Sequence, residues 1–199
     1  MPQQARKRAK ASDIGVRDRL LNAADRLFYQ EGVRAVGIDR VIAEADVAKA
    51  TLYAHFPSKD DLIVAVLQHR EESVSDFMRT AMERHGRRTK DRLRAFFAAL
   101  KDWFQTPDFR GCAFINAAVE LADPDHPGSK YVRGYKERFR GLIDELVEEA
   151  VGKAHARLTP AIAILVEGAI VTAVIHGSAG AAQVARDAAL ALVAGAKAG

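Results

Sequence analysis

The sequence predicts an all-α fold, and three observations support this prediction. Apolar residues recur every three or four positions along most of the chain, as they do on one face of an amphipathic helix. No run of residues shows the apolar and polar alternation typical of a half-buried strand. The chain has 199 residues, 49 % of them hydrophobic, which is enough for a sizeable globular core.

The excess positive charge lies in the first third of the chain. Residues 1–59 contain 11 basic and 7 acidic side chains, whereas residues 60–199 contain 19 of each. This distribution suggests an anionic partner for the N-terminal part, either nucleic acid or a membrane surface; a basic tail kept for solubility is the alternative. No uninterrupted apolar run reaches the roughly 18 residues of a membrane span, and "MPQQARKRAK" lacks the apolar stretch of a secretory signal. Cys112 is the only cysteine, which excludes an internal disulfide and fits a cytoplasmic location.

Three helices are predicted before residue 57. Residues 1–15 have the composition of a basic, disordered arm. A helix begins near Val16 and stops at Gly32, and a short second helix begins near Ile38. Asp46 stands where the chain must turn, and aspartate tolerates a left-handed conformation better than most residues. A third helix covers about Ala48–His55, because the following proline cannot continue it.

Longer helices are predicted in the rest of the chain. Ser58 is a candidate N-cap, with Asp61 as its capping-box partner, for a long helix that reaches about Arg84. The stretches "TKDRLRAFFAALKDWFQ" and "KYVRGYKERFRGLIDELVEEAV" are amphipathic, whereas "GCAFINAAVELA" is apolar enough to be buried on most sides. "DPDHPGS" reads as a loop, and "TPAIAILVEGAIVTAVIHG" and "AAQVARDAALALVAG" are the last two helices. The total is about nine helices.

The stretch "KATLYAHFPSKDDL" carries a polar face that packing alone does not explain. Leu52 and Phe56 are four residues apart and share an apolar face, while the other side chains of the third helix are hydrogen-bond donors or small. Two short helices joined by a tight turn form a helix-turn-helix, here over about residues 37–56, whose second helix enters the major groove of DNA. Lys49, Ala50 and Tyr53 then face the DNA.

The residues from about 16 to 65 resemble the TetR family of bacterial repressors. "TLYAHFPSKDDL" is similar to that family's "TLYxHFxSKxxL", and "LLNAADRLFYQEGVRAVGIDRVIAEADVAKA" is similar to its preceding helices. The resemblance implies that Lys49 and Ala50 face the bases and that the remaining candidates contact the DNA backbone: Arg40, Thr51, Tyr53, His55 and Lys59. It divides the chain into the arm, a DNA-binding domain over residues 16–62 and a regulatory and dimerisation domain over residues 63–199.

Two positions depart from the family pattern. Gly37 replaces the usual threonine or serine, so it caps the second helix weakly and has no side chain for a phosphate contact. Asp46 replaces the usual glycine of the turn and places an acidic group near DNA. Both departures affect the expected contacts of the second helix.

The resemblance implies that the later helices form a dimer interface. The last two helices carry long uncharged faces whose residues are candidates for it: Ile162, Leu165, Ala169, Ala173, His176, Val184, Ala188 and Leu192. Packing within one chain is the alternative explanation of these faces. A homodimer suits the function, because two recognition helices one DNA turn apart read a near-palindromic site.

The resemblance also implies a pocket for a small-molecule effector. Candidate lining residues are the aromatic and sulfur-containing side chains of the middle helices together with one amide: Met78, Met82, Phe97, Trp103, Phe104, Cys112 and Asn116. Plain core packing is the alternative for the aromatic residues and methionines. Cys112 follows a glycine, as in some electrophile- and oxidant-responsive members, so it is either a sensor or a small buried residue.

The sequence therefore favours a ligand-responsive repressor that binds double-stranded DNA. We find no phosphate loop, catalytic carboxylate pair, nucleophile motif or metal-site spacing, so we expect no enzyme activity, cofactor or metal. Two alternatives stay open: a transcriptional activator, and a small-molecule-binding protein of the same fold that no longer reads specific DNA.

Overall fold

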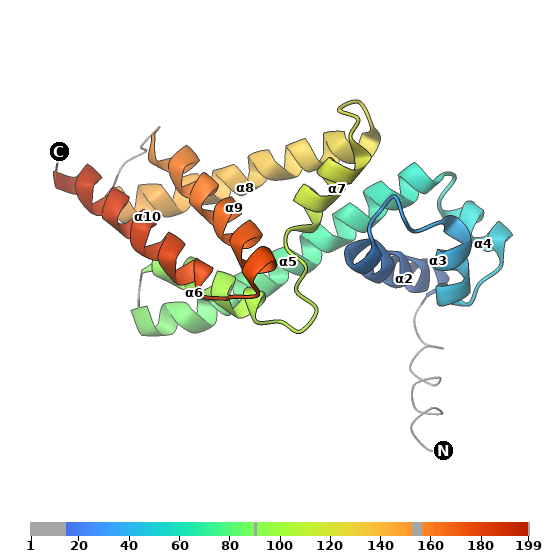
Figure 1. Cartoon of the computed structure of the whole chain (residues 1–199), viewed down its shortest axis with the longest axis horizontal. Coiled ribbons are helices and arrows are strands. Elements are labelled where there is room, and N and C mark those ends of the chain that lie inside the picture. The colour runs from blue at the N-terminus through green and yellow to red at the C-terminus, as the bar shows by residue number, and fades with distance from the viewer. Residues whose placement is uncertain (1–14, 90, 153–156, 199) are drawn as a thin grey trace, which may run out of the picture. The chain divides into compact units, whose positions relative to one another are not determined.

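The computed structural model describes residues 15–89, 91–152 and 157–198, and every regular element in these ranges is a helix (Figure 1). The helices are α2 (Val16–Glu31), α3 (Ile38–Ala45), α4 (Lys49–His55), α5 (Lys59–Thr89), α6 (Arg92–Phe104), α7 (Ala113–Leu121), α8 (Pro127–Val151), α9 (Leu158–His176) and α10 (Ala181–Ala198). The predicted all-α fold is confirmed. The predicted basic arm lies outside the described residues except for Gly15.

Contacts between residues divide the chain into two units. The first contains the residues up to Glu71 together with Ala113–Val132, and the second contains Glu72–Cys112 and Arg133–Gly199. This division differs from the boundary expected after residue 62, because α7 and the start of α8 group with the N-terminal helices. Helices α5 and α8 each contribute residues to both units.

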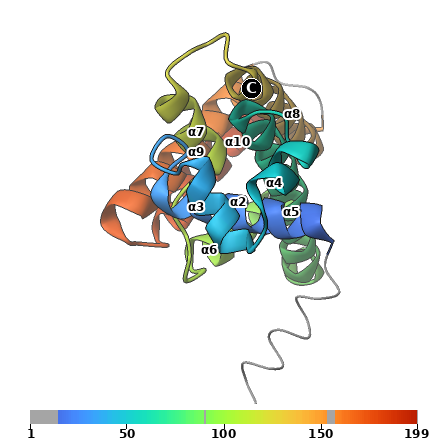
Figure 2. The same cartoon turned by 90° about the vertical axis from the view of Figure 1, so that its right-hand side faces the viewer.

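In the first unit, helices α2, α3 and α4 pack against one another (Figure 2). The apolar residues of α2 that follow the helix period are buried: Leu20, Leu21, Ala24, Leu27 and Phe28. Val41 of α3 and Leu52 of α4 are both 0 % exposed. The burial of these side chains holds the two short helices, which have too few residues to be stable alone.

The turns between these helices agree with the sequence predictions. Helix α2 ends at Glu31, and Gly32 follows with φ of 98°. Asp46 adopts the left-handed conformation, with φ of 52° and ψ of 58°. The Ser58 hydroxyl accepts a hydrogen bond from the Asp61 amide at 3.0 Å and donates one to the Asp61 carboxylate at 2.7 Å, which confirms the predicted cap of α5.

In the second unit, α10 packs against α9 and α6 (Figure 1). The Phe96 and Phe97 rings of α6 meet edge to face with centroids 5.6 Å apart, and both are 1 % exposed. Helix α9 is apolar on all sides. One face is buried in the chain, whereas Ile164 and Ile175 on another face are 70 % and 69 % exposed.

Helix α9 is long and apolar enough to cross a membrane by length and composition, although Glu167 interrupts its apolar run. In its most apolar window, 39 % of the residues are buried inside the protein. A helix that packs on protein over more than one face has the same composition. The burial of one face of α9 inside the chain therefore explains part of the apolar composition of this helix.

Helix α7 is less enclosed than its sequence predicted. Phe114, Ala117 and Leu121 are buried, but Val119 is 73 % exposed, so the expected burial on most sides is wrong for this residue. The loop after α7 is also shorter than expected, because α8 already begins at Pro127. Proline suits the first position of a helix, where its missing N–H has no intrahelical partner.

We expect Leu52→Ala to lower the free energy of unfolding by about 2–5 kcal/mol, because it leaves a cavity under α4. The neighbouring Tyr53→Ala is the control, since Tyr53 is 42 % exposed and its loss removes less buried packing than the loss of Leu52, which is 0 % exposed. Urea denaturation followed by circular dichroism measures both variants. Equal losses of stability would contradict the assignment of Leu52 as the anchor of α4.

Candidate nucleic-acid interface

Helix α4 has one buried face and one exposed face. Leu52 and Phe56 are 0 % and 3 % exposed, as their spacing predicted. The side chains on the opposite side are open to solvent: Lys49, Ala50, Tyr53 and His55, with Thr51 half-buried between them. The exposed face therefore displays an ammonium, a phenol hydroxyl and an imidazole, which are donors suited to phosphate oxygens and base edges.

Lys59 stands at the first position of α5, next to this face in the sequence. Its side chain is half-buried, and the Ser58 cap determines where the helix begins. The helix N-terminus favours an anion at this point. Asp60 and Asp61 occupy the same first turn, and their negative charges offset part of the attraction that Lys59 and the helix exert on phosphate.

Two of the predicted DNA-contacting cations form ion pairs within the chain. Arg40 Nη2 lies 3.4 Å from Glu31 Oε1, and Lys49 Nζ lies 3.2 Å from Asp39 Oδ1. The Arg40 and Lys49 side chains remain 58 % and 62 % exposed. Pairs this open to water contribute little to stability, so both cations remain available to DNA.

The N-terminus of α3 has no side-chain cap. Gly37 precedes the helix in extended conformation, and a Cβ atom built on it meets nothing within 4 Å. A larger side chain therefore has room here. The absence of a hydroxyl, noted as a departure from the family pattern, leaves this helix end without a side-chain hydrogen bond.

Glu120 of α7 holds the turn between α2 and α3. Its Oε2 accepts a hydrogen bond from the Arg34 amide at 3.1 Å. The same carboxylate lies against Gly32, where a built Cβ atom would be 2.8 Å from Oε2. No sequence pattern indicates this contact, because residues 86 positions apart carry no periodic signal.

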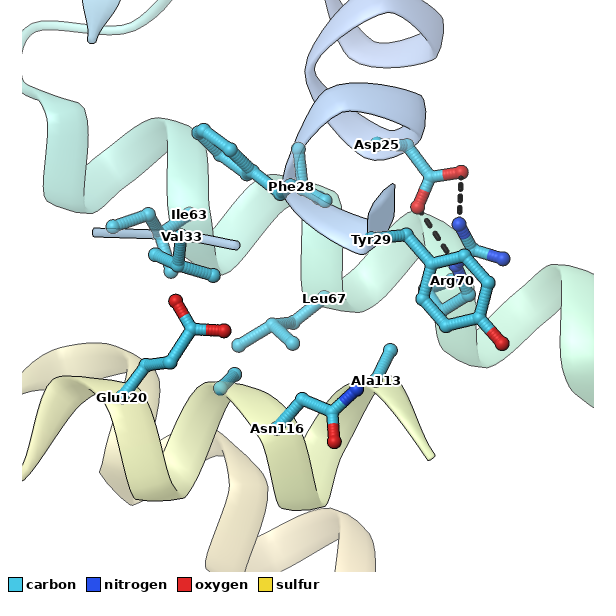
Figure 3. A pocket seen from close by; sticks show the side chains of 12 residues that line it. Asp25, Phe28, Tyr29, Val33, Ile63, Leu67, Arg70, Ala113, Asn116 and Glu120 are labelled. Atoms are coloured by element: carbon cyan, nitrogen blue, oxygen red, sulfur yellow. Dashed lines mark hydrogen bonds and ion pairs between the residues drawn. The ribbon is translucent and has the colours of Figure 1, made fainter. Parts of the chain in front are cut away.

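A small cavity lies among α2, α5 and α7 in the first unit (Figure 3). Arg70 Nε and Nη2 donate to the two Asp25 oxygens at 2.7 Å each, and the Tyr29 ring lies 4.3 Å from the guanidinium carbon. Asn116 and Glu120 approach from α7. The cavity volume of about 20 Å³ has room for one water molecule, so it is too small for an effector in this conformation.

A second cavity, a groove of about 400 Å³, lies among α6, α8 and α10 in the second unit. Asn116 lines the small cavity, but the other predicted pocket residues line neither of the two. Phe97 and Phe104 are buried, and Trp103 meets Phe109 edge to face at 5.1 Å. Met78 and Met82 are half-buried on α5. Apart from Asn116, these residues line neither of the two cavities described, and their effector role stays a prediction.

Cys112 is 7 % exposed and lies just before α7. Lys136 Nζ is 3.8 Å from its sulfur and 2.9 Å from Glu167 Oε1. The ammonium is thus shared between the thiol and a carboxylate. Among the described residues, no group of three or more histidine, cysteine, aspartate or glutamate side chains is placed to hold a metal ion.

The predicted dimer face of α9 needs correction. Ile162, Ala169 and Ala173 are 0 %, 5 % and 3 % exposed, because they pack inside the chain itself. The exposed apolar residues of this helix lie on other faces: Ile164, Val171, Val174 and Ile175. Leu165 and Ala188 are half-buried, while His176 is exposed, as are Val184 and Leu192 of α10 at 73 % and 41 %.

Comparison with known proteins agrees with the geometry of α3 and α4. A family model described as bacterial regulatory proteins of the tetR family matches residues 20–66, and one described as the tetracyclin repressor-like C-terminal domain matches residues 89–189. The crystal structure of SCO4454, a TetR-family transcriptional regulator from Streptomyces coelicolor, is similar with a TM-score of 0.81 and 31 % identity, over 92 % of this chain and 96 % of that chain.

Two curated proteins are similar over shorter lengths. The HTH-type transcriptional activator FasR of Mycolicibacterium smegmatis is 37 % identical over 45 % of this chain and 40 % of its own length. The HTH-type transcriptional repressor DhaR of a Mycobacterium species is 33 % identical over 54 % of this chain and 52 % of its own. The chain thus matches about half the length of these two relatives or less.

We expect Gly32→Ala to lower the free energy of unfolding by about 1–3 kcal/mol, because φ of 98° strains a residue with a side chain and Glu120 lies in the way. Gly141→Ala is the control, since that glycine is inside α8 with nothing within 4 Å of the built Cβ atom. It should raise stability by about 0.5–1 kcal/mol. Changes of the same sign in thermal or urea unfolding would refute this account.

Proposed function

The chain belongs to the TetR family of bacterial transcriptional regulators, and we propose that it is a ligand-responsive repressor that binds a near-palindromic operator as a homodimer. One observation carries the DNA-binding part of the proposal: Leu52 and Phe56 are buried, which leaves Lys49, Ala50 and Tyr53 on an exposed face of α4. That face has the donors and the close helix approach that major-groove reading requires.

The exposed apolar faces of α9 and α10 support the homodimer. Four large apolar residues of α9 and two of α10 are exposed, and the two helices pack against each other in the second unit. Exposed apolar side chains in such number on two packed helices favour an interaction site over an ordinary surface. A second copy presents the same faces, so a symmetric four-helix interface covers both.

Helix α7 supports the response to an effector. The chain passes from the second unit to the first between Cys112 and Ala113, and returns between Val132 and Arg133. Between these points, Glu120 bonds the turn before α3, and His126 Nε2 lies 3.2 Å from Asp60 Oδ1 at the start of α5. A rearrangement in the regulatory helices that moves α7 thus acts on the elements that position α4.

An activator remains the second candidate. FasR, which is similar to this chain, is named an activator, whereas DhaR is named a repressor. The DNA-binding helices serve both activities in the same way. Either activity requires access to chromosomal DNA, so we propose that the protein works in the cytoplasm.

The first experiment measures the binding of the purified chain to DNA from upstream of its own gene, by fluorescence anisotropy at several salt concentrations. We expect tight binding to this fragment and far weaker binding to a scrambled duplex. Equal and strongly salt-dependent binding to both would indicate attraction to phosphate alone. That outcome favours a family member that no longer reads specific DNA.

In the same assay, Tyr53→Phe and Lys59→Ala should weaken binding to every sequence, by about tenfold for one lost charge-assisted hydrogen bond. Lys59→Ala should also reduce the salt slope by about one unit, because one phosphate contact is lost. Lys101→Ala, which removes a lysine of α6 in the second unit, is the control and should bind like the parent. Unchanged binding by both test variants would show that the contacts are wrongly assigned.

For the dimer, we expect Val184→Asp to yield monomers in size-exclusion chromatography with light scattering, because a carboxylate cannot be buried unpaired in an apolar interface. Val119→Asp is a matched control, since both valines are 73 % exposed and Val119 lies on α7 in the first unit. A parent that is itself monomeric, or a Val184→Asp variant that remains dimeric, would count against this interface.

A further inference from the structure

Asp39 lies beside the base-facing Lys49, and none of the DNA contacts proposed above uses it. Its Oδ1 atom is 3.2 Å from Lys49 Nζ, and its side chain is 86 % exposed. In this conformation the carboxylate lies one hydrogen-bond length from the ammonium that is proposed to reach a base edge. Asp39 also lies in the first turn of α3, where the helix dipole favours a negative charge.

We propose that Asp39 is a specificity-determining residue, and that it reads one G·C base pair in each half-site together with Lys49. The proposal rests on the DNA-binding function proposed above. It assigns the ammonium to guanine O6 and N7 and the carboxylate to the cytosine N4 amino group, which are the base-edge partners that lysine and aspartate prefer.

The chemistry of the major groove matches the order of these two groups. A G·C pair presents two adjacent acceptors, N7 and O6, followed by the N4 donor of cytosine. O6 and N4 are hydrogen-bonded to each other, so they are about 2.9 Å apart. The separation of 3.2 Å between Lys49 Nζ and Asp39 Oδ1 is close to this spacing. In the ion pair, the Lys49 ammonium is the donor and the Asp39 carboxylate is the acceptor. In the base pair, guanine O6 is the acceptor that faces the ammonium, and cytosine N4 is the donor that faces the carboxylate.

The other base pairs fit less well. In an A·T pair, adenine offers one acceptor next to an amino donor, and thymine adds a methyl group beside its acceptor. The three donors of the ammonium find a second acceptor on guanine but not on adenine. A carboxylate alone on this surface repels the phosphates. Its charge is balanced by Lys49, so the pair adds selectivity rather than affinity.

Glu44 provides a matched comparison on the same helix. It is also an exposed acidic residue of α3, but it forms an ion pair with Arg26 of α2 rather than with Lys49. It is five positions from Asp39 and therefore points in a different direction around the helix. Glu44→Gln removes the same charge from α3 without altering the Lys49 pair.

The test is a selection of binding sites from a random-sequence duplex library by the full chain, followed by sequencing. The proteins are the parent, Asp39→Asn, Lys49→Met and Glu44→Gln, with Asp39→Ser as a second variant should the asparagine variant fold poorly. We expect the parent to enrich a symmetric site. In both Asp39→Asn and Lys49→Met, the preference for G·C over the other base pairs should fall about tenfold, and at the same position of each half-site. Glu44→Gln should retain the parent's site.

Three results would overturn the inference: an unchanged site with the Asp39 variants, altered preferences of the two test variants at different positions, or an A·T pair at the shared position. In each case the parent still enriches a site, so the proposed DNA-binding function stands. A parent that enriches no sequence would overturn both proposals together. Circular dichroism of each variant establishes that it is folded as the parent is.

Discussion

The burial of Leu52 and Phe56 is the interaction on which the candidate interface depends. Helix α4 has only seven residues and cannot form a stable helix by itself. Because these two apolar side chains are enclosed by the first unit, the opposite side of α4 is free to display polar groups. The Asp46 turn and the Ser58 cap then determine where α4 follows α3 and where α5 begins. The packing of Leu52 and Phe56 thus positions the hydrogen-bond donors of α4 that are proposed to contact DNA.

Charge on the DNA-binding helices is balanced rather than simply positive. Arg40 and Lys49 each have a carboxylate partner, and Asp60 and Asp61 follow Lys59. An interface built only of free cations attracts any DNA, because phosphate attraction carries no sequence information. Pairing the cations within the chain lowers this general attraction. The Lys49–Asp39 pair goes further, because it sets a donor beside an acceptor where a base pair can be read.

Helices α7 and α9 each pack inside one unit and also carry a proposed further role. Helix α7 belongs to the same unit as the DNA-binding helices and contacts their turn through Glu120, although Cys112, directly before it, belongs to the second unit. Helix α9 buries Ile162 inside the chain and exposes Ile164 on another face. Its apolar composition agrees with a buried face in the core and with the proposed dimer face. In each helix, some residues stabilise the unit to which the helix belongs, and others have a proposed role in function.

Local patterns in the sequence determined the helices, the turn at Asp46, the cap at Ser58 and the two faces of α4, because these depend on residues at most a few positions apart. They did not determine which face of α9 is internal, since a helix that is apolar all round has no periodic signal to orient it. The Lys49–Asp39 and Glu120–Arg34 contacts, the placement of α7 and the small cavity join residues from separate elements. Only tertiary packing decided these features, because the distance between such side chains depends on how whole helices dock.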